Sequence, residues 1–240
     1  MRRLLIDAGN TNIKLACASG EHWHASDSMP TGRAAELSLA GYADVSEVWV
    51  SNVAGAAVAQ LIVDACSVLQ LTPRFIAAQS EQCGVKNGYT VPAQLGCDRW
   101  AALIAAWHRN KAACLAVCSG TATTIDALSD DGEFIGGLIL PGISLMQRSL
   151  NGATAQLPSC QGGYQKFPRS TADAILSGAI QATCGAIRRQ HDLLGVADAP
   201  VLLGGGAAAE LSPYLDLPVQ RVDNLVLQGL LLIAREAEHE

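Results

Sequence analysis

The chain has 240 residues, of which 50% are apolar and 5% aromatic, and its formal net charge is −6 at pH 7. This length suffices for one large or two small domains with good cores, and the acidic balance without a Lys/Arg cluster argues against nucleic acid or an anionic membrane as the main partner. We expect no secretory signal before the first strand, and the most apolar stretch, 225–234, is too short to span a bilayer.

The first half of the chain predicts three consecutive strands, followed by alternating strands and helices. The hydrophobic pattern predicts strands near 3–7, 12–18, 21–27, 47–51 and 73–77, and helices near 55–69 and 97–110. A loop rich in turn residues, Ser80 to Leu95, precedes the second helix and contains Asn87-Gly88 and Pro92.

The second half repeats this order of elements. Strands are predicted near 114–118, 123–128, 134–140 and 200–203, and helices near 143–150, 171–190 and 223–236. Because both halves begin with three strands joined by tight turns, we expect two α/β lobes, 1–110 and 111–240, with a ligand cleft between them. One continuous doubly wound sheet is the alternative.

The eight cysteines form no CxxC pair and no zinc-type spacing, and the five histidines are scattered. Most cysteines lie in apolar surroundings. We therefore expect reduced core thiols in a cytoplasmic protein.

The most informative motif is the run from Asp7 to Lys14, with sequence DAGNTNIK. An apolar strand ends in Asp7, a tight turn follows, and the next strand carries Lys14 near its start, which predicts a β-hairpin. The turn amides, the Thr11 hydroxyl and the Lys14 ammonium can hold phosphate oxygens, while Asp7 can hold a metal ion or a water. An ordinary surface turn is the alternative.

Three further stretches contain residues suited to ligand binding. Gly120 to Asp126 combines small and hydroxyl residues at a strand turn, although Thr also simply favours strands. Tyr89 to Trp100 places Asp98 and Arg99 at a helix start, where Asp98 can accept a proton or only cap the helix. Gly204-Gly205-Gly206 can expose backbone to a flat ring or serve close packing. The chain lacks the GxxxxGK[ST], GxGxxG and GxSxG patterns.

Together these motifs resemble the type III pantothenate kinase family, within the acetate and sugar kinase/Hsp70/actin superfamily. The resemblance covers nearly the whole chain, in order. It rests on these runs: Asp7 to Thr11 with Lys14, Tyr89 with Pro92 and Leu95 to Arg99, Gly120 to Asp126, Gly136 to Gly142, Thr154 to Pro158, and Thr171 with Ala174-Ile175 and Gly178.

The resemblance implies two ribonuclease H-like lobes of the actin-like ATPase fold, with a nucleotide cleft between them. It implies a homodimeric enzyme that phosphorylates pantothenate with ATP and Mg²⁺, the first step of coenzyme A synthesis. Asp98 would be the general base, and Asp7 would lie near Mg²⁺. The residues implied for ATP are Asp7, Ala8, Gly9, Asn10, Thr11, Asn12, Ile13, Lys14 and Thr121; those implied for pantothenate are Tyr89, Gly96, Cys97, Asp98, Arg99 and, from the partner subunit's helix, Thr171.

The chain departs from the family pattern at Cys118, where the family often has an Asp that binds a monovalent cation. A thiol is a poor ligand for a hard cation such as K⁺, so a requirement for K⁺ or NH₄⁺ stays open. Two other functions also stay open. One is a sugar or acetate kinase, although the Cys-rich zinc motif of ROK sugar kinases is absent, and the other is a nucleotide-binding regulatory factor.

Overall fold

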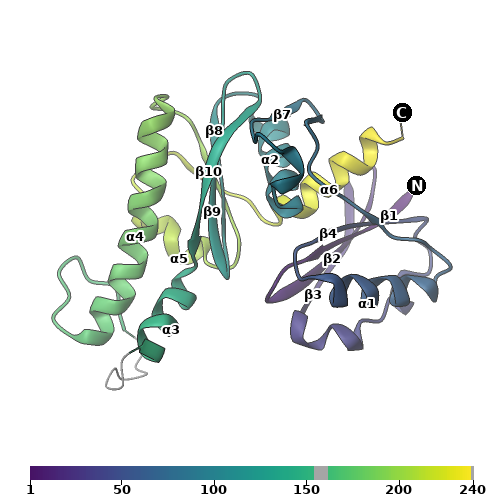
Figure 1. The fold of residues 1–240 in the computed structure, drawn as a ribbon, viewed down its shortest axis with the longest axis horizontal. Helices are drawn as coiled ribbons and strands as arrows, with labels where there is room; N and C mark the ends of the chain where they lie inside the picture. The colour runs from purple at the N-terminus through teal and green to yellow at the C-terminus, as the bar shows by residue number, and fades with distance from the viewer. Residues whose placement is uncertain (154–161, 239–240) are drawn as a thin grey trace. The chain divides into compact units, whose positions relative to one another are not determined.

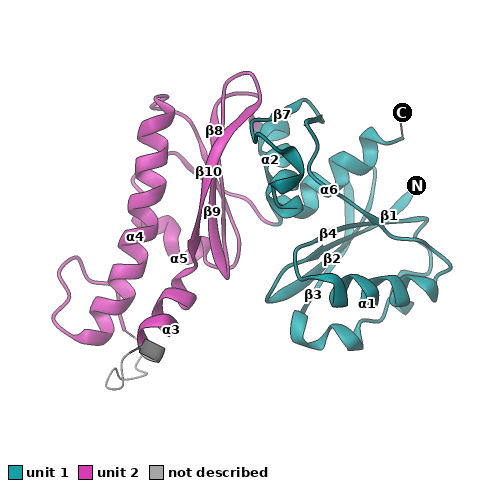
Figure 2. Ribbon diagram, viewed as in Figure 1, with its two compact units in different colours: residues 1–109, 224–240 teal, residues 110–223 magenta. Residues whose placement is uncertain are grey.

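The computed structural model describes residues 1–153 and 162–238, so the run Thr154 to Pro158 lies outside the described residues. The chain forms two compact units (Figure 2). Unit 1 comprises residues 1–109 and 224–240, and unit 2 comprises residues 110–223. Each unit contains a mixed β-sheet with helices packed against it (Figure 1).

In unit 1 the strand order of the sheet is β3-β2-β1-β4-β5. Strands β1, β2 and β3 pair antiparallel with one another, whereas β4 pairs parallel with β1 and β5 pairs parallel with β4. The elements are β1 (Arg2–Ala8), β2 (Asn12–Ser19), β3 (His22–Pro30), β4 (Glu47–Asn52), α1 (Ala56–Ser67), β5 (Arg74–Phe75), the hairpin β6 (Glu81–Gln82) and β7 (Val85–Asn87), α2 (Cys97–Asn110) and α6 (Leu225–Glu236), with 3₁₀ turns at Thr31–Glu36, Ala40–Tyr42 and Pro92–Gln94.

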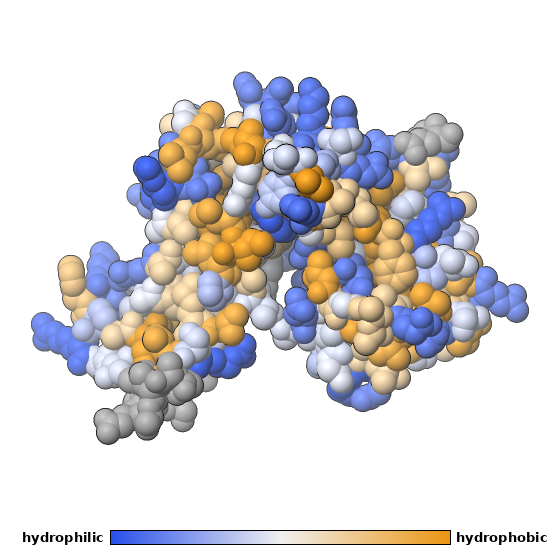
Figure 3. Space-filling view, viewed as in Figure 1, coloured by the Kyte–Doolittle hydropathy of each residue, from blue (hydrophilic) through white to orange (hydrophobic). Residues whose placement is uncertain are grey.

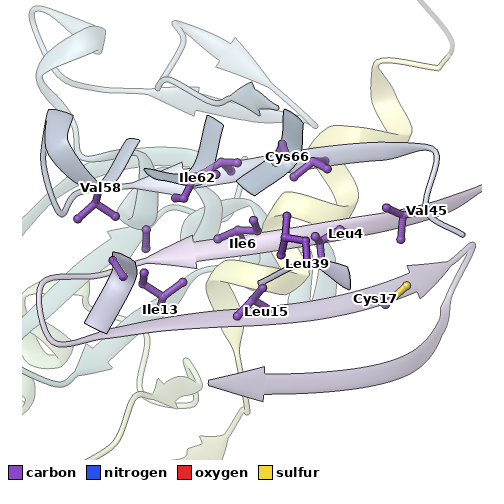
Figure 4. Packing of buried hydrophobic residues seen from close by; sticks show 14 residues of the cluster. Leu4, Ile6, Ile13, Leu15, Cys17, Leu39, Val45, Val58, Ile62 and Cys66 are labelled. Atoms are coloured by element: carbon purple, nitrogen blue, oxygen red, sulfur yellow. The ribbon is translucent and has the colours of Figure 1, made fainter. Parts of the chain in front are cut away.

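Alternation along β1 decides which face each side chain occupies. Leu4, Ile6 and Ala8 join the apolar cluster in which Ile62 and Cys66 of α1 cover one face of the sheet (Figure 4). Asp7 therefore projects from the opposite face, the one on which α6 packs.

The last helix belongs to unit 1, which differs from the division at residue 110 expected from the sequence. Helix α6 approaches α2 so closely that a Cβ added at Gly229 would lie 1.9 Å from the carbonyl oxygen of Ala101. Only glycine allows this contact. The sequence pattern predicts the helix but contains no signal for which unit it joins.

In unit 2 the strands follow the order β12-β11-β8-β9-β10, the same arrangement as β5-β4-β1-β2-β3 in unit 1. Helices α3, α4 and α5 contribute to the apolar core on one face of this sheet. The elements are β8 (Cys114–Ser119), β9 (Ala122–Leu128), β10 (Glu133–Pro141), α3 (Ile143–Ala153), α4 (Thr171–Leu194), β11 (Val201–Gly204), α5 (Ala208–Leu211), a 3₁₀ turn at Ser212–Tyr214 and β12 (Val219–Arg221). The predicted architectural repeat is confirmed.

The repeat makes Cys118 the counterpart of Asp7. Asp7 pairs with Lys14 across the hairpin β1–β2, and Cys118 pairs with Thr124 across β8–β9. Unit 2 thus carries a thiol and a hydroxyl where unit 1 carries two opposite charges.

The strands missing from the sequence prediction are short: β6, β7 and β12 have two or three residues each. Such lengths show too little alternation to be recognised. Helix α4 ends beyond its predicted end, at Leu194, where Gly195 adopts a left-handed conformation with φ of 73°. Among the described helices, none is both long and apolar enough to cross a membrane.

Candidate active site

The turn between β1 and β2 is held from two sides. The Gly9 N–H donates to the carbonyl oxygen of Asn12 at 3.0 Å, which closes the turn. Thr31 binds it from the end of β3: its N–H donates to the Thr11 carbonyl at 2.8 Å, and its hydroxyl donates to the Gly9 carbonyl at 2.7 Å. The side chains of Asn10, Thr11 and Asn12 remain exposed. The sequence reasoning missed Thr31, because nothing local links it to a turn twenty residues earlier.

Asp7 lies beside this turn in surroundings that disfavour its charged form. Lys14 is directly opposite on β2, and Ser51 is its neighbour on β4. Burial raises the pKa of the Asp7 carboxyl from 3.8 to about 7; the positive charge of Lys14 opposes this rise, and the negative charge of Asp98 adds to it. Three predicted site residues, Asp7, Lys14 and Asp98, therefore interact electrostatically within unit 1.

The start of α2 positions Asp98. The Cys97 thiol contacts the Ser51 hydroxyl and the Asn52 carbonyl, both at 3.5 Å, which ties the helix start to the end of β4. The Asp98 carboxylate accepts the Arg99 N–H at 2.8 Å, and a Cβ added at Gly96 would come within 2.7 Å of the same carboxylate oxygen. Gly96 thus leaves room for Asp98. Burial raises the pKa of the Cys97 thiol, which disfavours the reactive thiolate form.

Arg99 and Tyr89 meet although they come from different segments. The guanidinium of Arg99 donates to the Tyr89 hydroxyl at 3.0 Å, and its central carbon lies 5.7 Å from the centroid of the Tyr89 ring. The Arg99 side chain is only 6% exposed. The arginine beside the proposed base is therefore fixed by the loop that precedes the helix.

In unit 2 the turn bearing Thr121 is built from tightly packed glycines. A Cβ at Gly142 would lie 2.0 Å from the Gly120 carbonyl oxygen, and a Cβ at Gly205 would lie 2.2 Å from that of Ser119. The Gly142 N–H also donates to the Thr121 carbonyl at 2.9 Å. Gly205 is therefore required for packing, which accounts for at least this member of the glycine run at 204–206. Thr121 itself is exposed.

Thr171 is the first residue of α4, and its neighbour Ser170 caps the helix by accepting the Asp173 N–H at 3.2 Å. Thr171 lines an apolar groove of about 340 Å³ between α3 and α4. The other lining residues are Met146, Leu150, Ala174, Ile175, Gly178 and Ala179. Apolar surface is visible over α3 in Figure 3.

Asp7 can serve as one carboxylate ligand of a metal ion that arrives with a nucleotide. In the described part of the chain, no three His, Cys, Asp or Glu side chains gather as metal ligands. Mg²⁺ commonly needs only one or two carboxylates because phosphate oxygens and waters complete its shell. Asp7, beside a turn with exposed Asn and Thr residues, fits this requirement.

Solved structures of other proteins share the fold of this chain. A chain from Campylobacter jejuni assigned to the Baf family of transcriptional activators has the same fold, with a TM-score of 0.65 at 22% identity over 99% of this chain and 100% of that one. A ROK hexokinase from Thermus thermophilus aligns with a TM-score of 0.50 at 12% identity, covering 100% of both chains. The fold is that of the actin-like ATPases and sugar kinases.

Sequence similarity identifies the family, whereas the structural likeness identifies only the fold. The family model for type III pantothenate kinase matches residues 3–192. A type III pantothenate kinase from Aromatoleum aromaticum is 49% identical over 236 residues, which cover 97% of this chain and 98% of the relative. The chain belongs to the type III pantothenate kinase family.

Proposed function

We propose that this protein transfers the γ-phosphoryl group of ATP to the primary hydroxyl of pantothenate and so catalyses the first step of coenzyme A synthesis. The observation that carries the proposal is the placement of Asp98 at the start of α2, in electrostatic range of Asp7, which pairs across the β1–β2 hairpin with Lys14. Family membership identifies the reaction, and this group of charges supplies the residue types that it needs.

In this proposal, residues 7–14 and Thr121 bind ATP. The turn amides and the Lys14 ammonium hold phosphate oxygens, and Asp7 holds Mg²⁺, which neutralises developing charge on the phosphates when bound. Because burial raises the pKa of Asp7 to about 7, a neighbouring cation would favour its ionised form.

Pantothenate is held by Tyr89, by residues 96–99 and by Thr171. Asp98 takes the proton from the substrate hydroxyl, and Arg99 pairs with the substrate carboxylate. Since phosphoryl transfer depends mainly on position and electrostatics, the fixed Arg99–Tyr89 pair and the space left by Gly96 contribute by positioning the substrate and the base.

A coupled assay of ADP release tests the function. ATP and Mg²⁺ are supplied with pantothenate, acetate or hexoses, each with and without K⁺ or NH₄⁺. We expect turnover with pantothenate alone among these acceptors. Turnover only with a sugar or acetate would replace the proposal by another kinase activity, and nucleotide binding without turnover would favour the regulatory alternative. Turnover with and without K⁺ or NH₄⁺ shows whether the enzyme, which carries Cys118 at this position, needs a monovalent cation.

The same proposal places the enzyme in the cytoplasm. The seven cysteines of the described residues are all free thiols, as expected in a reducing compartment.

Replacing Arg99 with Ala is expected to raise KM for pantothenate by about tenfold or more, with a smaller effect on KM for ATP, because a charge-assisted pair with the substrate carboxylate is lost. Steady-state kinetics measure both constants. Arg109→Ala is the matched control, since Arg109 is an exposed arginine on the same helix. Equal rises in both KM values for Arg99→Ala would instead indicate a general structural role.

We propose further that the active form is a homodimer in which Thr171 of one subunit completes the partner's pantothenate site. Two features support this. Thr171 does not cap its own helix, since Ser170 does, and it borders an apolar groove whose α4 residues are mostly small. Small side chains allow a helix to approach a symmetric copy closely.

Mixing two inactive chains tests the shared site. One carries Asp98→Asn and the other Thr171→Arg, and subunit exchange is confirmed before the assay. Part of the activity should return, because each heterodimer contains one site with both native residues. A chain with both changes, mixed with Asp98→Asn, is the control that should stay inactive. No recovery would exclude the shared site, and a monomer at assay concentration would exclude the dimer.

A further inference from the structure

Asn87, the last residue of β7, holds the segment that carries Tyr89. Its side-chain carbonyl accepts the Tyr89 N–H at 3.1 Å, and its side-chain amide donates to the Pro92 carbonyl at 3.3 Å. The same amide donates to the Gln79 carbonyl at 3.0 Å. One side chain thus joins both ends of the stretch 89–92 and ties it to the chain before β6.

This set of partners requires an amide side chain. One partner is an N–H donor and two are carbonyl acceptors, so the group must accept once and donate twice. An aspartate in its place could accept from Tyr89 but would face two carbonyl oxygens with no proton to donate. Alanine would lose all three hydrogen bonds.

Tyr89 transmits the position of this segment to Arg99 by its hydroxyl, which accepts from the guanidinium at 3.0 Å. Arg99 follows Asp98 in α2 and is 94% buried, as its exposed fraction of 6% implies. The contacts therefore run without a break from Asn87 through Tyr89 to Arg99.

We propose that Asn87 is a positioning residue for pantothenate: it fixes Tyr89 against Arg99 so that both meet the substrate in one geometry. The inference rests on the proposed function, in which Tyr89 and Arg99 bind pantothenate. Misplacing binding groups by about 1 Å can cost on the order of 10²-fold in rate.

The rest of the loop has separate anchors, which makes the proposal testable. Gln82 of β6 accepts from the indole N–H of Trp100 at 2.9 Å, and Glu236 of α6 accepts the Cys83 N–H at 2.8 Å. Loss of the Asn87 side chain should therefore loosen residues 88–92 while the loop stays attached to α2 and α6.

The first experiment compares Asn87→Ala and Asn87→Asp with the unmodified protein in the ADP-release assay. Both variants should raise KM for pantothenate by about tenfold and leave KM for ATP nearly unchanged. Asn110→Ala is the matched control, because Asn110 also donates to two backbone carbonyls, those of Ala112 and Ala113. Equal effects of Asn87→Ala on both substrates, or none on pantothenate, would overturn the proposal.

A double-mutant cycle then tests whether Asn87 acts through the tyrosine. Tyr89→Phe removes the hydroxyl that Arg99 contacts. If the proposal is correct, adding Asn87→Ala to Tyr89→Phe raises KM for pantothenate much less than Asn87→Ala does alone. Fully additive effects would mean that Asn87 does not act through this contact.

Amide hydrogen exchange supplies a readout that does not depend on turnover. Asn87→Ala should speed exchange in residues 88–95 and leave the strands of unit 1 protected. Unchanged exchange there would overturn the positioning role. Absence of pantothenate turnover in the unmodified protein would instead refute the proposed function, and with it the role for that substrate, whatever the exchange data show.

Discussion

Asp98→Asn should lower kcat by about 10² to 10⁴-fold, the usual effect of losing a general base, with ATP binding nearly unchanged. The asparagine side-chain oxygen can still accept the Arg99 N–H that Asp98 accepts at 2.8 Å, so the helix start should keep its structure. Turnover at saturating pantothenate and ATP binding by calorimetry measure the two effects.

The control for this variant is Asp64→Asn, an exposed position on α1 whose carboxylate accepts a hydrogen bond from the Gln60 side-chain amide at 2.9 Å. Turnover of Asp98→Asn close to that of Asp64→Asn would reduce Asp98 to a residue that stabilises the helix start.

Asp7→Asn should abolish most turnover and at the same time stabilise the free protein. The pKa of Asp7 is about 7 in the folded state and 3.8 in the reference state. Well below pH 3.8 both states are protonated. Between pH 4 and 7 the unfolded state loses its proton first, so the free energy of unfolding falls by about 1.4 kcal/mol per pH unit. Above pH 7 the destabilisation is constant, at most on the order of 4 kcal/mol.

Urea unfolding without nucleotide, repeated from pH 4 to pH 8, measures this effect. Asp7→Asn should be more stable than the unmodified protein at pH 8, and the difference should become small near pH 4. A variant that is less stable at pH 8 would contradict the electrostatic account of Asp7.

The larger elements of both units could be predicted because their patterns are long. The apolar run of β1 and the helical spacing of apolar residues in α2 appear in the sequence, and the structure buries both. The three antiparallel strands that open each half are also correct, which is why the repeat was predictable from order alone.

The contacts that organise the candidate site were not predictable in the same way. Tyr89, Asp98 and Arg99 were singled out by residue type and family resemblance, but nothing local indicates that Thr31 holds the β1–β2 turn. In the sequence, Asn87 stands out only as part of the Asn87-Gly88 turn signal. Its side-chain contacts depend on where the carbonyl groups of Gln79 and Pro92 lie in the folded chain, and a local sequence pattern does not encode these positions.

Unit 1 is discontinuous, and this affects how the protein is made. Its sheet and α2 come from residues 1–109, but α6, which packs against β1 and brings Gly229 onto Ala101, comes from residues after 223. During synthesis from the N-terminus, unit 1 can therefore be completed only after α6 has emerged from the ribosome. Unit 2 is one continuous segment and can fold earlier. The half that carries Asp7 and Asp98 is therefore completed only when α6 docks.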